Sequence, residues 1–276
     1  MSRGSSPADP LMGIDPSGIR FLGCATRQGV DFRRTVTIGR QQLFGVGSSR
    51  RTSTYAEPLF ESLGAESVNS LDMSPYEGAT LIADLNLPVP ADWRSTYTCV
   101  FDGGSLEHIF DLPQALHNMM SLVAPDGHFI GAYPANNQVG HGLFQFSPEL
   151  FFRAMSASNG FEIRSVMVAE RSGWTRRSRR WWDVCDPLVL GHRVEFTSRR
   201  PCELFVLARR IGPVPDRLTA HGQSDYVQAW EAAEPRSRYA DAVDRLPWPV
   251  PAVAAEVLRR RAQPSGYRRA SAPALP

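Results

Sequence analysis

Residues 97–148 constrain the fold of this chain more than any other segment. An apolar run at 97–101 ends abruptly in Asp-Gly-Gly, and apolar residues at helical spacing follow it. A Pro-Asp-Gly turn at 125–127 then precedes a second apolar run at 128–133. Strand, polar loop, helix, turn and strand make a βαβ unit, whose binding loops lie at the carboxyl ends of parallel strands. The sequence therefore predicts an α/β fold with polar loop residues gathered at one edge of a sheet.

The same segment resembles the second half of class I S-adenosylmethionine (SAM) dependent methyltransferases. Their pattern is an apolar strand, a "slEHv" helix start, a "LkPGG" turn and another strand. Here SLEHI stands at 105–109, LVAPDG at 122–127 and the second strand at 128–134. The resemblance covers residues 35–210. It implies a doubly wound, mostly parallel seven-stranded sheet with an antiparallel edge strand, and SAM as the cofactor.

The resemblance also implies which residues hold the cofactor. Asp72 ends a predicted strand at 67–72, where a carboxylate can accept both ribose hydroxyls. Asp84, at the end of the strand predicted at 79–84, matches the acid that reads the adenine. Each acid could instead only stabilise a turn. Met73 and Leu85 adjoin the two acids, and the rest of the predicted cofactor cleft consists of Gly39, Asp102, Gly103 and Gly104.

The loop after the first strand departs from the family pattern. The family reads "vLDlGcGtG", whereas residues 37–42 read TIGRQQ, with Thr37 in place of the acid and Gln41 in place of the second glycine. Arg40 and Gln41 would crowd the methionine end of the cofactor, and Thr98 replaces a further acid. Three explanations stay open: a reshaped loop that binds SAM, a fold that has lost SAM, or a cofactor loop elsewhere in the chain.

Transfer of a methyl group to a hydroxyl needs a base, and imidazole titrates near neutral pH. His108 and His141 are the candidates, and Glu107 is a third candidate catalytic residue. In the alternative, His108 faces away from the pocket, His141 stabilises its loop, and Glu107 interacts with a helix dipole. His117 and His128 are too far apart along the fold to share a site, so we expect no metal.

The chain divides into three parts. Residues 1–33 form an N-terminal arm or cap, residues 34–212 the methyltransferase-like domain, and residues 213–276 a C-terminal helical extension with a disordered end. Helices are predicted at 54–63, at the Ser-Pro-Glu start 147–149, and around 226–233 and 253–261. An Arg- and Trp-rich insertion at 170–200 is expected to form a lid or hairpin.

The stretch between Arg176 and Trp182 in this insertion could bind an anionic ligand or a membrane surface. The usual meaning of such a charge run is a solvated face, here with the tryptophans packed beneath it. With a net charge of +2 and no RNA- or DNA-binding motif, we expect no nucleic-acid partner.

The chain starts without the apolar stretch of a signal peptide, and its four cysteines have no zinc-like spacing. We expect a cytoplasmic protein, and the sequence leaves a homo-oligomer open. The function that we expect is methyl transfer from SAM to a small-molecule or saccharide acceptor. The alternative is a methyltransferase-like protein without SAM chemistry that serves as a binding or assembly subunit.

Overall fold

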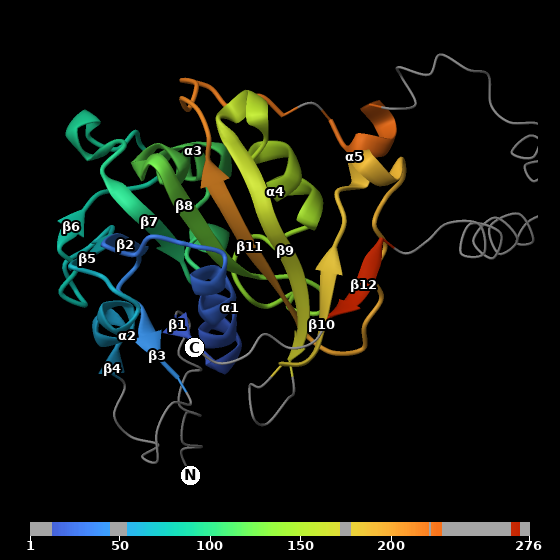
Figure 1. Cartoon of the computed structure of the whole chain (residues 1–276), viewed down its shortest axis with the longest axis horizontal. Helices are drawn as coiled ribbons and strands as arrows, with labels where there is room; N and C mark the ends of the chain where they lie inside the picture. Colours follow the sequence, from blue (N-terminus) through green and yellow to red (C-terminus); the bar gives the residue numbers. More distant parts are fainter. Residues whose placement is uncertain (1–12, 45–53, 172–177, 221, 228–265, 271–276) are drawn as a thin grey trace, which may run out of the picture.

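The computed structural model describes residues 13–44, 54–171, 178–220, 222–227 and 266–270. Its described strands form a nine-stranded sheet and a three-stranded sheet (Figure 1). The large sheet contains β2 (Arg34–Ile38), β5 (Ser67–Asp72), β6 (Leu81–Ile82), β7 (Tyr97–Asp102), β8 (Val123–Pro134), β9 (Phe161–Arg171), β10 (Ser178–Val184), β11 (Cys202–Arg210) and β12 (Tyr267–Ala270). The small sheet contains β1 (Gly13–Ile14), β3 (Gln42–Leu43) and β4 (Thr54–Tyr55).

Half of the large sheet is parallel and confirms the predicted doubly wound α/β fold. Its strands lie in the order β6-β5-β2-β7-β8, and each neighbouring pair is parallel. This is the 3-2-1-4-5 order of doubly wound sheets, in which ligands bind where the order reverses, between β2 and β7. The strand predicted at 79–84 is confined to Leu81–Ile82, because the Asp84 carboxylate accepts the Asn86 backbone amide and turns the chain.

The other half of the large sheet is antiparallel and larger than predicted. It continues from β8 through β11, β9 and β10 to β12, at the opposite edge from β6 (Figure 1). The antiparallel strand expected at the edge is therefore internal, and the predicted seven strands become nine. The reason is that β11 is buried along most of its length, whereas residues of β12 are half-buried or exposed and suit an edge.

Helices cover both faces of the large sheet. On one face α1 and α2 pack on Phe101 and Phe205, and on the other α3 and α4 pack on Val100 and Leu204. Neighbouring residues of one strand thus point to opposite cores, as the pleat requires. The helices are α1 (Pro16–Arg27), α2 (Glu57–Ser62), α3 (Leu112–Leu122), α4 (Pro148–Ala154) and α5 (Pro187–Leu190), with the 3₁₀ turns η1 (Ala91–Trp93), η2 (Leu106–His108) and η3 (Ala157–Asn159).

Side-chain caps fix where two of these helices begin. Ser147 caps α4 as predicted, with its hydroxyl accepting the Glu149 amide at 3.1 Å. Asp15 caps α1 by accepting the Ser17 amide at 2.8 Å, which places a helix in the predicted N-terminal cap region. The helix predicted at 54–63 begins only at Glu57, because its first two residues form β4 instead.

The end of the chain corrects one expectation. Tyr267–Ala270 lie in the segment expected to be disordered, yet they form β12 and pair antiparallel with β10. The ring of Phe196 explains this, since it packs 4.7 Å from Trp182 and 4.8 Å from Tyr267 between ring centroids. The helix predicted at 253–261 and most of the one at 226–233 lie outside the described residues, as do residues 1–12.

The Arg- and Trp-rich insertion includes a hairpin, because β10 pairs antiparallel with β9. Trp181 is fully buried against Phe205 and α1, so this tryptophan packs inside the molecule. Arg176 and Arg177 lie outside the described residues. No helix in the described ranges combines the length and hydrophobicity that a bilayer span requires.

Candidate functional site

Two loops meet at the switch point between β2 and β7. Gly39 follows β2 with a φ of 69°, and its amide donates to the Leu71 carbonyl at 2.7 Å. Gly104 follows β7 with a φ of 103°, a backbone conformation that favours glycine. The Ser105 hydroxyl donates to the Ile38 carbonyl at 2.8 Å. This hydrogen bond ties the two predicted cofactor loops together.

The side chain of Gln41 fills the space between these loops. It is 1% exposed, and its amide nitrogen donates to the Ile38 carbonyl at 2.6 Å. A Cβ on Gly103 would lie only 2.3 Å from Gln41 Oε1, and this oxygen has no hydrogen-bond partner within the described ranges. Arg40 points elsewhere, with Nε 2.7 Å from Glu57 Oε1. Of the two residues expected to crowd the cofactor, only Gln41 therefore occupies the gap.

The two predicted nucleoside acids lie in a row beside this gap. Ile38 pairs with Leu71, which places Asp72 next to Gly39, and the Ala83 amide donates to the Asp72 carbonyl at 2.9 Å. Asp72 Oδ1 accepts the Ser74 amide at 3.2 Å. The pKa of Asp84 is lowered by the hydrogen bonds that its carboxylate accepts from the backbone and side-chain amides of Asn86.

The other two predicted cofactor residues on this side differ in exposure. Met73 is 70% exposed, whereas Leu85 is 6% exposed and belongs to the hydrophobic core. Leu85 therefore contributes packing. The two acids beside these residues, Asp72 and Asp84, accept hydrogen bonds within their own turns.

Asp102 supports its own loop from inside the protein. Its carboxylate accepts the Ser105 amide at 2.8 Å and the Leu106 amide at 3.2 Å. Burial raises the pKa of Asp102 to about 7, and the nearby charge of Glu107 contributes to the rise. The sequence placed Asp102 in the cofactor cleft, but its carboxylate is fully buried and holds the turn.

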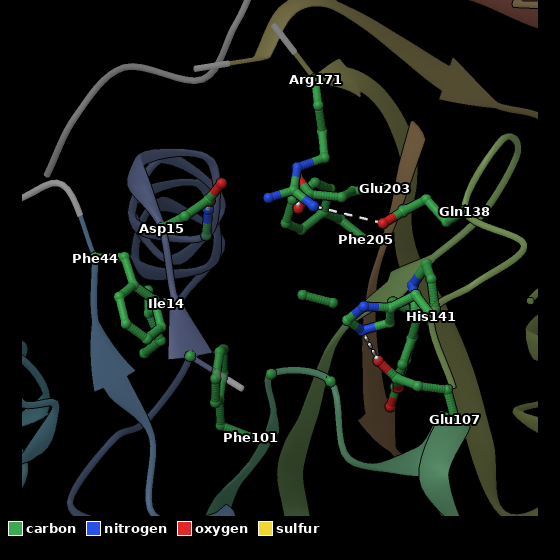
Figure 2. A pocket seen from close by; sticks show the side chains of 17 residues that line it. Ile14, Asp15, Phe44, Phe101, Glu107, Gln138, His141, Arg171, Glu203 and Phe205 are labelled. Carbon is green, nitrogen blue, oxygen red and sulfur yellow. Dashed lines mark hydrogen bonds and ion pairs between the residues drawn. The ribbon is translucent and has the colours of Figure 1, made fainter. Parts of the chain in front are cut away.

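A pocket opens beside the switch point, between the start of α1 and the ends of β7 and β8 (Figure 2). Its cavity volume of about 80 Å³ is below the ~300–1,000 Å³ of typical ligand pockets. Arg171 lies at its upper rim in Figure 2, with Nε 3.2 Å from Glu203 Oε1 and an Nη 3.4 Å from Gln138 Oε1. A ligand of nucleoside size requires part of this lining, or Gln41 beside it, to move.

Two of the three predicted catalytic residues, Glu107 and His141, line the pocket, and His108 lies beside them. Glu107 is fully buried, and its Oε1 lies 3.3 Å from Nε2 of His141, which points toward it from the loop after β8 (Figure 2). The His108 and His141 ring centroids are 5.5 Å apart. Glu107, His108 and His141 each offer a ligand atom, and these atoms lie within 4.8 Å of one another. The sequence pointed to no metal, and these three residues come together without a pattern that the sequence shows.

Backbone contacts hold this cluster in place. The Leu143 amide donates to the Glu107 carbonyl at 2.7 Å, which fixes the loop of His141 onto η2. Gly142 has a φ of 72°, and a Cβ there would lie 2.8 Å from Glu107 Cγ. Only glycine lets the two segments approach so closely.

Sequence reasoning missed several pocket residues. Arg171 and Glu203 end and begin antiparallel strands, so an argument from the ends of parallel strands could not find them. Asp15 belongs to the segment before α1, which the sequence marked only as a cap. For Glu203 the sequence offered one signal, a charged residue near the start of the apolar run at 202–208. The predicted residues Gly39, Asp72 and Asp84 lie outside the pocket lining.

No protein-family model and no curated protein sequence matches the chain. Solved structures of SAM-dependent methyltransferases are similar to it. One from Mesorhizobium loti is 17% identical, with a TM-score of 0.40, over 68% of this chain and 96% of that one. The 1,6-didemethyltoxoflavin N1-methyltransferase of Burkholderia thailandensis, solved with S-adenosylhomocysteine, is 14% identical, with a TM-score of 0.40. The match covers 70% of this chain and 77% of that chain. A methyltransferase in complex with the Haloferax volcanii Trm112 activator is also 14% identical, over 70% and 89%, with a TM-score of 0.40.

Proposed function

We propose that this chain transfers a methyl group from SAM to a small-molecule or saccharide acceptor. The observation that carries the proposal is the switch point, where the loops of β2 and β7 meet with Asp72 at the end of the adjoining strand. A carboxylate at that place suits the two hydroxyls of a ribose. Glycines at 39, 103 and 104 keep the backbone free of side chains on both sides of the gap.

Asp72 and Asp84 would hold the nucleoside, and the Glu107–His141 pair would serve the acceptor. When bound, SAM supplies an electrophilic methyl group. With Nε2 of His141 donating to Glu107, Nδ1 is the nitrogen that would take the proton of an acceptor hydroxyl, a contribution of about 10²–10⁴-fold. The Glu107 carboxylate, 3.3 Å from Nε2, would orient the ring.

Gln41 must leave the gap for this cofactor to enter. Its buried Oε1 accepts no hydrogen bond from the described residues, which costs about 1–3 kcal/mol and makes the observed position easy to abandon. We therefore expect Gln41→Ala to bind SAM more tightly than the unchanged chain. Loss of one donated hydrogen bond, about 0.5–1.5 kcal/mol, corresponds to a roughly two- to tenfold gain.

Calorimetric titration with SAM and S-adenosylhomocysteine tests the proposal. Asp72→Ala should weaken binding by at least tenfold, because a hydrogen bond to a charged group contributes about 1.5–3 kcal/mol. Asp92→Ala, an exposed acid on η1, is the matched control and should bind like the unchanged chain. Absence of binding in both the unchanged chain and Gln41→Ala would refute SAM chemistry.

A second candidate, a binding or assembly subunit without SAM chemistry, is favoured by the same glutamine. In that case Gln41 is a permanent filler of a vestigial gap. Gln41→Ala would then be less stable than the unchanged chain and still bind no nucleoside, and Asp72→Ala would change no ligand interaction.

A further inference from the structure

The Glu107–His108–His141 cluster contains a second imidazole, which an acid–base pair does not need. Two imidazoles and one carboxylate converge from η2 and from the loop after β8, although more than thirty positions separate His108 from His141 in the sequence. Glu107 and His141 line the pocket, and His108 adjoins them at the exposed side. The cluster thus has a buried end and an accessible end.

The distances suit a transition-metal ion. Ligand atoms about 2.0–2.2 Å from a tetrahedral zinc ion lie about 3.4 Å apart. Glu107 Oε1 and His141 Nε2 are already 3.3 Å apart. The three ligand atoms lie within 4.8 Å of one another, so His108 completes the triangle by a small rotation of its exposed side chain.

The buried carboxylate supplies an independent argument. The Glu107 side chain is 0% exposed, and neither of its oxygens accepts a hydrogen bond from any described residue. A buried carboxylate that is neither hydrogen-bonded nor well paired is costly. His141 alone is a weak counter-charge, because its side chain is 29% exposed and it is charged only when protonated. A divalent cation would provide the missing partner on the side that Glu107 faces.

We propose that Glu107, His108 and His141 form a binding site for one divalent transition-metal ion, of the zinc class. Two imidazoles and a carboxylate are a ligand set that such ions take, with remaining positions open to water or substrate. Because Glu107 and His141 line the pocket, an acceptor hydroxyl bound there could coordinate the ion. In the metal-bound protein His141 is a ligand and no longer serves as the base, and the ion would instead lower the pKa of an acceptor hydroxyl that coordinates it.

This proposal concerns the metal alone and does not rest on SAM binding. Full-length protein stripped with a chelator should bind one Zn²⁺ per chain in a calorimetric titration. Co²⁺ should bind competitively and develop visible absorption bands of a low-coordinate site. A titration without a saturable, one-to-one binding event would overturn the proposal, whatever the SAM titration shows.

His108→Gln is the sharpest variant. His108 is exposed and outside the Glu107–His141 contact, so a plain acid–base pair predicts no effect, whereas a metal site predicts a loss of at least tenfold in Zn²⁺ affinity. Glu107→Gln and His141→Gln should lose at least as much. Circular dichroism checks that each variant folds.

Two controls exclude other sources of zinc affinity. His192→Gln changes a histidine whose Nδ1 lies 2.9 Å from the Arg193 carbonyl, away from the cluster. Cys24→Ser with Cys185→Ser removes the two half-buried thiols. Both controls should bind Zn²⁺ like the unchanged chain. Unchanged affinity in His108→Gln, or lost affinity in either control, would contradict the assignment.

Discussion

His128 is a buried titratable residue far from the pocket edge of its strand. It is 7% exposed on β8, between Cys99 and Arg209, and its Nδ1 has no hydrogen-bond partner in the described part of the chain. Burial lowers its pKa, and the charges of Arg209 and Arg164 lower it further. The folded protein therefore holds this imidazole neutral at pH values where the unfolded chain protonates it.

The lowered pKa of His128 determines how the free energy of unfolding changes with pH. Between the folded pKa and the unfolded value near 6.5, the unfolded state binds more protons, so the free energy of unfolding falls as pH falls. His128→Asn should lack this loss. Urea unfolding of both proteins at pH 8 and pH 5 measures it, with pH 8 as the internal reference because the imidazole is neutral in both states. A stability difference that is the same at both pH values would contradict the account.

At the residue scale, sequence reasoning named candidate residues but not the contacts between them. Glu107, His108 and His141 were named as candidate catalytic residues from their loops. Their convergence was invisible, because it depends on Gly142 admitting a close approach and on a backbone hydrogen bond from Leu143. Such contacts lie between distant segments and leave no periodic pattern in the sequence.

At the scale of elements, β12 depends on its aromatic contacts. Tyr267 packs on Phe196, which also contacts Trp182 of β10. Tyr267→Ala should destabilise the protein by about 1–3 kcal/mol, because it removes a large ring from this cluster. Thermal unfolding measures the loss, and SAM and zinc affinities should stay unchanged.

Arg269→Ala is the matched control for this strand, since Arg269 is exposed and pairs opposite Trp182 through its backbone. It should unfold at nearly the temperature of the unchanged chain. Equal destabilisation by both substitutions would mean that the strand is held by its ladder rather than by the ring of Tyr267.

The elements that sequence reasoning predicted well are the local ones. The strands of the βαβ unit follow from apolar runs bounded by turns, and α4 follows from its Ser-Pro-Glu start. Strand order was harder, because β11 returns between β8 and β9 after a long connection. The alternating residues at 203–208 predict an antiparallel partner at 161–169, which β9 provides, but they do not predict the second neighbour, β8.

At the scale of the whole molecule, metal binding should raise the free energy of unfolding. An ion present at 100 times its dissociation constant stabilises the folded state by about 2.7 kcal/mol. In a domain of this size that raises the melting temperature by roughly 5–10 °C. Thermal scans of the unchanged chain with Zn²⁺ and with a chelator measure the shift, and His108→Gln should show little of it. An equal shift in this variant would place the ion elsewhere.

The reversed direction of β11 has a consequence for how such a protein can diverge. β9 ends at Arg171 and β11 begins at Cys202, both at the edge of the sheet where the pocket lies. The whole connection between them therefore leaves from the site and returns to it. If the chain transfers methyl groups as proposed, substitutions in the part of this connection outside β10 would change which acceptors are admitted, while β10 keeps Trp181 in the core and the parallel half keeps its hydrogen bonds.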